Sequence, residues 1–115
     1  MREIQRLAEN GDRRARLALD IYAHRLIREA GAMIAVLGGL DALVFTGGVG
    51  ENSSALRQAL CASLGFLNLC LDPQANSHAI PDCNVAEPGS SIPVLVIAAN
   101  EEWEIARESY RVLAA

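Results

Sequence analysis

Apolar residues recur every three or four positions over residues 13–37, a period typical of an amphipathic helix. The residues in this stripe are Leu17, Ile21, Leu26, Ala30, Met33, Ile34 and Leu37. A shorter helical pattern covers residues 1–10 and stops at Gly11-Asp12, where Asp12 is suited to cap the next helix. Gly38-Gly39 ends the long pattern, because glycine is common just past a helix C-terminus. The pattern predicts a short helix followed by a long one.

Two apolar runs without alternation, residues 42–45 and 93–98, predict strands. Continuous apolar character is typical of strands buried on both faces, as in a parallel sheet. Residues 66–71 predict a third, short strand, closed by Asp72-Pro73. These strands are few and short, so the pattern predicts a narrow sheet.

Helical patterns follow the first and the last of these strands. Residues 53–64 carry leucines at every fourth position, and residues 101–113 form a last helix with Asn100 as its N-cap. Residues 74–92 are rich in Asn, Pro, Gly and Ser, which predicts the one long irregular loop.

The order helix, strand, helix, strand, loop, strand, helix is typical of an α/β protein. We expect one domain over residues 1–115, with two or three short strands and flanking helices that include a long N-terminal one. The strands and the long helix carry more apolar surface than this chain can cover. This excess indicates a piece of a larger sheet, or a chain completed by a partner.

Composition and charge limit the classes of function that this chain can have. The chain is 51% hydrophobic and 21% charged, as in folded proteins, and its net charge of −4 disfavours nucleic acid as a partner. Its basic residues are all arginine, which excludes a P-loop lysine or a Schiff base. Three cysteines and two distant histidines indicate neither a disulfide framework nor a zinc site. No apolar run approaches the ~20 residues of a membrane span, so we expect a cytoplasmic protein without a membrane partner.

The segment FTGGVGENSS, residues 45–54, places glycines between a strand and a helix. Three interpretations remain open. The glycines could form only a tight turn, or a dinucleotide fingerprint in which Asp72 binds the ribose, or a different nucleotide site. Gly48 and Gly50 would let a phosphate approach the backbone, and Asn52 could hydrogen-bond it. A Walker A loop is excluded because it needs a lysine.

A second strand also runs into a polar helix start, at Asn100-Glu101-Glu102. Carboxylates there could hold Mg²⁺, which prefers oxygen ligands. They could equally offset the helix dipole, with Asn100 as the cap.

Several quoted segments together resemble the acetokinase family of acetate, propionate and butyrate kinases. LDALVFTGGVGENSSALRQAL, LGFLNLCLDPQAN and VLVIAANEEWEIAR are similar to its C-terminal part. The opening MREIQRLAENGDRRARLALDIYAHRL resembles the segment after its D-M/F-R motif. The resemblance implies part of an actin/Hsp70/sugar-kinase-like (ribonuclease H-like) domain. It also implies transfer of phosphate between ATP and a short carboxylate, with Mg²⁺, giving ADP and an acyl phosphate.

The resemblance carries roles onto particular residues. The ADP site would be lined by Gly48, Val49, Gly50, Glu51, Asn52 and Arg2. Glu101 would help to hold Mg²⁺. Val49 stands where the family usually has Ile, and Ala99 where it has Thr. The family's phosphate loop and catalytic residues lie upstream of this segment, so no catalytic residue is expected here.

We therefore expect a nucleotide-binding part of an acetate-kinase-like phosphotransferase that is inactive alone. Its partner would be a second copy, as in family dimers, or the missing N-terminal half. Two alternatives are a non-catalytic, homodimerising remnant and a Rossmann-like dinucleotide binder. For the other polar and aromatic side chains we expect structural roles. Arg57, Arg107 and Arg111 are expected on solvent faces, Trp103 in packing, and Tyr22 and Tyr110 in the core or at a dimer face.

Overall fold

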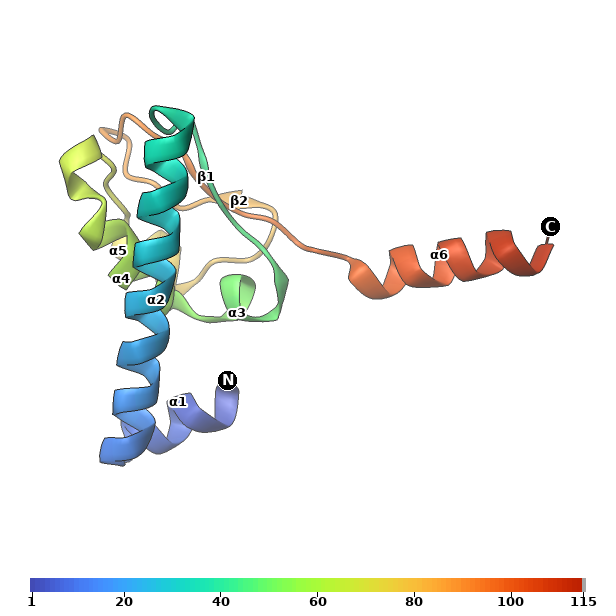
Figure 1. Cartoon of the computed structure of the whole chain (residues 1–115), viewed down its shortest axis with the longest axis horizontal. Helices are drawn as coiled ribbons and strands as arrows, with labels where there is room; N and C mark the ends of the chain where they lie inside the picture. The colour runs from blue at the N-terminus through green and yellow to red at the C-terminus, as the bar shows by residue number, and fades with distance from the viewer. Residues whose placement is uncertain (115) are drawn as a thin grey trace.

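A computed structural model describes residues 1–114, except for the side chain of Arg2. Figure 1 shows a small packed body, a long helix along one side of it, and a last helix that projects away. In chain order the elements are α1 (Arg2–Glu9), α2 (Arg13–Leu37), β1 (Leu43–Phe45), α3 (Gly47–Asn52), α4 (Ser54–Ser63), η1 (Gly65–Leu67), α5 (Pro73–Ser77), β2 (Cys83–Asn84), β3 (Val94–Val96) and α6 (Glu101–Ala114).

The long helix α2 begins and ends as the sequence predicts. The side chain of Asp12 accepts hydrogen bonds from the backbone N–H groups of Arg14 and Ala15, so it caps the first turn. Gly38 ends the helix in the left-handed conformation, with φ 77°. Each end therefore follows from a side chain or a backbone property that is local in sequence.

The apolar face of α2 is only partly covered. Leu26, Ala30 and Ile34 pack against the core. The remaining members of the stripe are more than half exposed, namely Leu17 (58%), Ile21 (53%), Met33 (56%) and Leu37 (74%). The middle of the helix thus carries the packing, and both of its ends present apolar side chains to solvent.

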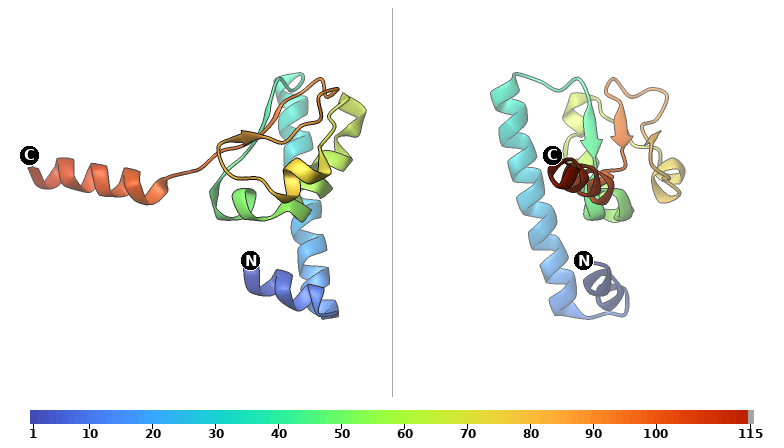
Figure 2. Two further views of the ribbon diagram at one scale, coloured as in Figure 1. Left: turned by 180° about the vertical axis from the view of Figure 1, so that it is seen from behind. Right: turned by 90° about the vertical axis from the view of Figure 1, so that its right-hand side faces the viewer.

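The sheet has three strands in the order β1-β3-β2. The strand β1 pairs in parallel with β3, with Leu43 opposite Val94, whereas β2 pairs antiparallel with β3 (Figure 2). The two strongest strand predictions are confirmed, and so is the narrow sheet. The expectation that both faces of β1 are buried is wrong, because Val44 is 52% exposed.

The core lies where α4 packs against the sheet. Its best-buried side chains are Leu64, Val85, Val94, Val96 and Cys61. Burying such side chains contributes about 1.5–3 kcal/mol each to folding, so this cluster supplies most of the driving force.

The strand predicted at residues 66–71 is wrong. A 3-10 turn, η1, occupies its start, and Asn68 follows with a positive φ of 56° that no strand residue adopts. Only Leu71 makes a β-bridge, to Ala86. Asp72 does not close a strand; it caps α5, accepting from the N–H groups of Gln74 and Ala75. The segment 74–92, predicted as a loop, therefore contains most of α5 and all of β2.

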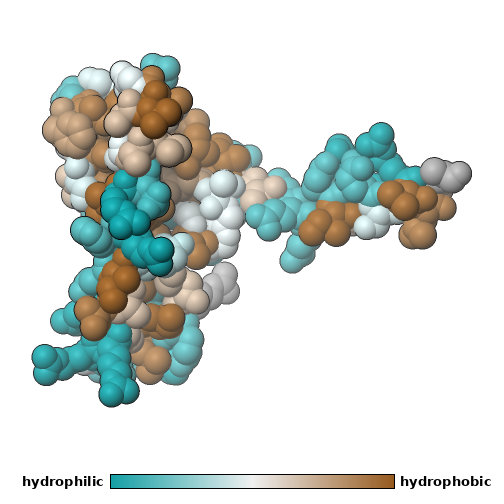
Figure 3. All heavy atoms as spheres, in the orientation of Figure 1, coloured by the Kyte–Doolittle hydropathy of each residue, from teal (hydrophilic) through white to brown (hydrophobic). Residues whose placement is uncertain are grey.

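The last helix, α6, makes almost no contact with the body (Figures 1 and 3). All of its described residues are exposed, including Trp103 (64%) and Tyr110 (74%). The prediction that Trp103 is a packing residue is therefore wrong, and Tyr110 is not in the core; Tyr22, 42% exposed, is not in the core either. Within residues 1–114, no helix combines the length and apolar character that crossing a membrane requires.

Candidate functional site

The glycine segment forms a helix of its own, α3. Thr46 is extended (φ −148°, ψ 170°), and Gly47 then turns the chain with a φ of 72°, a conformation that favours glycine. Ser53 separates α3 from α4 and its hydroxyl accepts from the Leu56 N–H at 3.4 Å. The expectation of a turn leading directly into one helix at residue 53 is thus corrected to a short glycine helix followed by a second helix.

A hollow of about 380 Å³ lies between α3 and the start of α6. It is lined by Gly47, Gly48, Glu51, Ala99, Asn100, Glu101, Glu102 and Trp103. The two polar stretches singled out in the sequence therefore face each other. They meet because β1 and β3 are parallel neighbours, so their carboxyl ends lie at the same edge of the sheet.

The carboxylate of Glu51 ties the two sides of this hollow together. Its Oε1 accepts a hydrogen bond of 2.9 Å from the backbone N–H of Ala99. This bond points the carboxylate at the end of β3. On the other side, Asn100 has a positive φ of 51°, and its carbonyl accepts from the N–H of Glu104 at 3.2 Å. The turn into α6 is therefore left-handed at the residue predicted to be a cap.

Gly47 and Gly48 leave the floor of the hollow open. A Cβ on Gly47 would lie 3.9 Å from Oε1 of Glu101, and a Cβ on Gly48 would meet nothing within 4 Å. Gly50 differs, because its Cβ would lie 3.2 Å from the backbone carbon of Phe45. Gly50 thus allows α3 to approach β1 closely, and its bare side is turned toward protein rather than toward the hollow.

The other predicted site residues lie around α3. Asn52 Nδ2 donates to the carbonyl of Gly48 at 2.9 Å. Val49 is half-buried and does not line the hollow. The predicted role of the Arg2 side chain lies outside the described residues.

A second cavity, of about 450 Å³, lies on the α1 side of the glycine helix. Met1 contributes from the N-terminus, Gln5 from α1 and Asp20 from α2. Asn52, the last residue of α3, and Ser53 after it line the other side. Gln5 Nε2 donates to Ser53 Oγ at 2.6 Å. The glycine helix and its last residues therefore separate two cavities, of which one is polar and acidic and the other is mixed.

Arg57 is the main residue that sequence reasoning missed. The sequence predicts Arg57 on a solvent face, yet it is 2% exposed. Its guanidinium donates to the carbonyls of Gly50 (2.7 Å), Glu51 (2.9 Å) and Asn76 (2.7 Å), and to Oδ1 of Asn76 (2.7 Å). Burial lowers the pKa of Arg57 from its ordinary value. Arg107 and Arg111, in contrast, are exposed as expected.

A signal for the burial of Arg57 was present in the sequence. Position 57 is in phase with Leu60, Cys61 and Leu64, which together make the buried stripe of α4. A charged residue that is in phase with the buried stripe of a helix can be buried with its hydrogen bonds satisfied as readily as it can lie at the surface.

The hollow presents oxygen atoms of the kind that Mg²⁺ prefers as ligands. Glu51, Glu101 and Glu102 are the acidic residues that line it. Among residues 1–114, no three His, Cys, Asp or Glu side chains lie close enough together to hold a metal by themselves. Mg²⁺ commonly takes one or two carboxylates and completes its shell with water and phosphate oxygens, so the residues fit such a site.

Comparison with known proteins identifies the class of protein to which this α/β fold and glycine helix belong. The sequence profile of the Acetokinase family matches residues 1–107. The chain therefore belongs to the acetokinase family.

Individual relatives agree with this assignment. The chain is 53% identical to an acetate kinase of Leifsonia xyli over 100% of its own length and 29% of the relative's. It is 49% identical to an acetate kinase of Gloeobacter violaceus over 98% of its own length and 28% of the relative's. The chain thus spans less than a third of the curated relatives that it matches.

Solved structures confirm the fold. Porphyromonas gingivalis acetate kinase superimposes with a TM-score of 0.80 at 36% identity, covering 97% of this chain and 28% of that one. Entamoeba histolytica acetate kinase superimposes with a TM-score of 0.83 at 29% identity, covering 96% of this chain and 30% of that one. A propionate kinase of Francisella tularensis matches with a TM-score of 0.78 at 38% identity, covering 93% of this chain and 27% of that one. The prediction of part of an actin/Hsp70/sugar-kinase-like domain is confirmed.

Proposed function

We propose that this chain, a single domain over residues 1–115, supplies one part of the nucleotide site of an acetate-kinase-like phosphotransferase. The whole enzyme would transfer phosphate between ATP and a short-chain carboxylate in the cytoplasm. The observation that carries the proposal is the hollow between α3 and the start of α6, in a chain of the acetokinase family. Its open glycine backbone and facing carboxylates match what a nucleotide phosphate and Mg²⁺ require.

The roles proposed for the individual residues follow from their places. Gly48 exposes its backbone to the phosphates, and Asn52 and Glu51 hold the glycine helix in shape. Val49, Gly50 and Arg2 are proposed as nucleotide contacts only from their match to the family motifs, and the second cavity, on the α1 side, can receive the nucleoside. Glu101 would hold Mg²⁺, directly or through water. The bound ion would neutralise phosphate charge during transfer.

We further propose that the chain does not catalyse phosphate transfer by itself. Phosphoryl transfer depends on positioning the acceptor and neutralising charge around the moving phosphate. This chain spans about 28% of the acetate kinases that it matches, and none of the described residues that line the hollow is a cation. The acceptor site would come from the remaining part of such an enzyme.

The dinucleotide alternative loses its main support. That interpretation needed Asp72 at the end of a strand, free to bind a ribose. Asp72 instead caps α5 with its carboxylate, and the strand is absent from the described residues.

Titration with ADP tests the proposal. Trp103 lines the hollow and is 64% exposed, so its fluorescence should change when a nucleotide enters. We expect a saturable change that requires Mg²⁺, with a matching heat in calorimetry. Glu101→Ala should weaken binding about tenfold, the loss expected when a charge-assisted interaction is removed. Asn52→Ala should weaken binding by less, because Asn52 Nδ2 then no longer holds the carbonyl of Gly48. Glu108→Ala, on the same helix but outside the hollow, is the matched control and should bind as the unchanged chain does.

Absence of any heat with ADP, in the folded chain, would contradict the proposal. A change in Trp103 fluorescence that is the same with and without Mg²⁺ would contradict the role of Glu101.

A second candidate function, a homodimerising chain without catalysis, is favoured by the exposed side of α6. Ile105, Val112 and Leu113 are 66%, 76% and 87% exposed on a helix that leaves the body. Sedimentation at micromolar concentration separates the two candidates. A dimer that binds no ADP would favour the second function, and a monomer would exclude it.

A further inference from the structure

Arg57 is a buried cation that has no carboxylate partner. Its side chain is 2% exposed, and none of the ion pairs in the described part of the chain includes it. A buried charge is costly unless hydrogen bonds satisfy it. Here the four bonds to carbonyl and amide oxygens, all between 2.7 and 2.9 Å, do so.

These bonds join three helices. From α4, Nη1 of Arg57 reaches the carbonyls of Gly50 and Glu51 at the end of the glycine helix. Nε and Nη2 reach Asn76 in α5, and Asn76 in turn donates to the carbonyl of Ser54 at 2.9 Å. The guanidinium is planar and its donors have fixed directions, so the position of α5 determines where the end of α3 lies.

The end of α3 needs such a partner. The last carbonyls of a helix have no intrahelical donor. In a helix of six residues these carbonyls are a large share of the backbone acceptors. Arg57 satisfies two of them with charge-assisted bonds, which are stronger than neutral ones.

Glu51, one of the two residues whose carbonyls accept from Arg57, also contacts the edge of the hollow. Glu51 accepts from Arg57 with its backbone carbonyl and from the Ala99 N–H with its side chain. A rotation of α3 would therefore move Glu51 away from Ala99 and shift Gly47 relative to Glu101. The contacts run without a gap from α5 through Arg57 to the mouth of the hollow.

We propose that Arg57 is a positioning residue that holds the glycine helix in the orientation that forms the hollow, and so sets the affinity of the site for a nucleoside diphosphate. The effect on affinity rests on the proposed function. The effect on the order of the glycine helix does not, and this separates the two in an experiment.

Hydrogen exchange in the whole chain without nucleotide tests the first effect. The reporter is the Ser53 N–H, which bonds to Val49 in α3 at 3.0 Å, and the reference is the Val85 N–H, which bonds to Val94 in the sheet at 2.8 Å. In Arg57→Lys we expect exchange at Ser53 to accelerate about tenfold more than at Val85, because lysine cannot bridge both helices. The control Ile92→Val removes a core methyl group away from α3 and should raise both rates by the same factor.

Equal acceleration at Ser53 and Val85 in Arg57→Lys would overturn the proposal, because a residue that only supports the core would act in that way. Unchanged exchange at both positions would also overturn it. If Arg57→Lys does not fold, Asn76→Ala decides the question, since it removes the Oδ1 acceptor of Arg57, together with the bond from Asn76 to the Ser54 carbonyl, and leaves the arginine in place. We expect a smaller but still selective acceleration at Ser53, and equal rates would overturn the proposal.

Calorimetry with ADP and Mg²⁺ on the same variants tests the second effect. We expect Arg57→Lys to raise the Kd about tenfold, while Ile92→Val leaves it unchanged. An unchanged Kd in Arg57→Lys would overturn the role in affinity. If the unchanged chain binds no ADP, the proposed function fails, and the exchange ratio still decides whether Arg57 positions the glycine helix.

Discussion

The helices α4 and α6 have similar patterns and opposite surroundings. In α4 and the residue that follows it, the stripe of Arg57, Leu60, Cys61 and Leu64 is buried. In α6 Trp103, Tyr110 and Leu113 fall on one side at the same kind of spacing, and all are exposed. The comparison shows that periodicity identifies which face of a helix is apolar, but not whether anything covers it.

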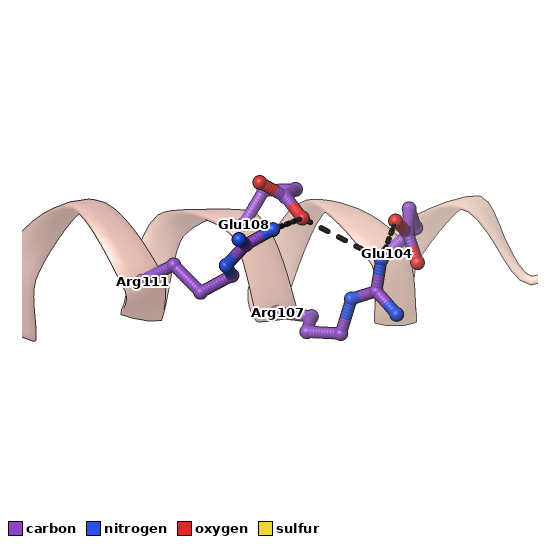
Figure 4. A network of polar contacts seen from close by, with 4 residues as sticks. All are labelled: Glu104, Arg107, Glu108 and Arg111. Carbon is purple, nitrogen blue, oxygen red and sulfur yellow. Dashed lines mark hydrogen bonds and ion pairs between the residues drawn. The ribbon is translucent and has the colours of Figure 1, made fainter.

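The polar side of α6 explains how an uncovered helix can still be well formed. Figure 4 shows Glu104, Arg107, Glu108 and Arg111 in one chain of contacts along it. Arg111 Nη1 lies 2.9 Å from Glu108 Oε1, and Arg107 contacts both glutamates. Arg107 also lies over the Trp103 ring, 5.4 Å from its centroid. Local side-chain pairs thus replace, in part, the tertiary packing that stabilises α4.

Truncating one leucine at the end of each helix, Leu64 directly after α4 and Leu113 in α6, should show the largest difference. Leu64 is 2% exposed and Leu113 is 87% exposed. We expect Leu64→Ala to lower the free energy of unfolding by about 2–5 kcal/mol, since it loses burial and leaves a cavity. Leu113→Ala should change it by less than about 0.5 kcal/mol. Urea denaturation followed by circular dichroism measures both, and equal losses would mean that α6 is covered in solution.

The pH dependence of the packed region should follow Cys61. Burial raises the pKa of the Cys61 thiol to about 11 from 9.0, with the charge of Arg57 partly opposing the shift. The folded state therefore keeps the proton after the unfolded state has lost it. Stability is full below pH 9 and falls as the pH rises toward 11, by about 2–3 kcal/mol in all.

Urea denaturation between pH 8 and pH 11 measures this loss. Cys61→Ala should flatten that part of the profile, and an unchanged slope in this variant would assign the pH dependence to another group.

Two neighbouring glycines should differ in what they tolerate. Gly47 has a φ of 72°, so Gly47→Ala should cost about 1–2 kcal/mol through strain in the left-handed region. Gly48 has open space around it, and Gly48→Ala should be neutral or slightly stabilising within a helix. Thermal unfolding of the two variants tests this, and a larger loss in Gly48→Ala would contradict the structure of α3.

The smallest expected effect lies on the polar side of α6. Glu108→Gln removes a carboxylate that pairs with Arg111, and exposed pairs of this kind contribute about 0.2–0.5 kcal/mol. We expect a slight loss of helical signal at low salt that disappears in 1 M salt, where charges are screened. A loss that persists in high salt would show that Glu108 contributes something other than charge.

Much of the fold was predictable because its signals are local. The ends of α2 follow from Asp12 and Gly38, and the parallel pairing of β1 and β3 follows from two apolar runs. The strand predicted at 66–71 failed because apolar content alone cannot separate a strand from a 3-10 turn with Asn68 in the left-handed region. The meeting of the glycine segment with Glu101 was predictable from the order of strands and helices, whereas the burial of Arg57 was not recognised.

The sequence by itself determined the ends of α2, the two main strands, the family and the candidate residues around the glycine segment. Each of these depends on neighbours in the chain or on motifs that stay intact in the linear sequence. Only the tertiary structure decided that Arg57 is inside, that Gly50 serves a close approach to Phe45, and that α6 stands uncovered. The physical reason is that burial is a property of what lies opposite a residue, and the partners of Arg57 come from two other helices.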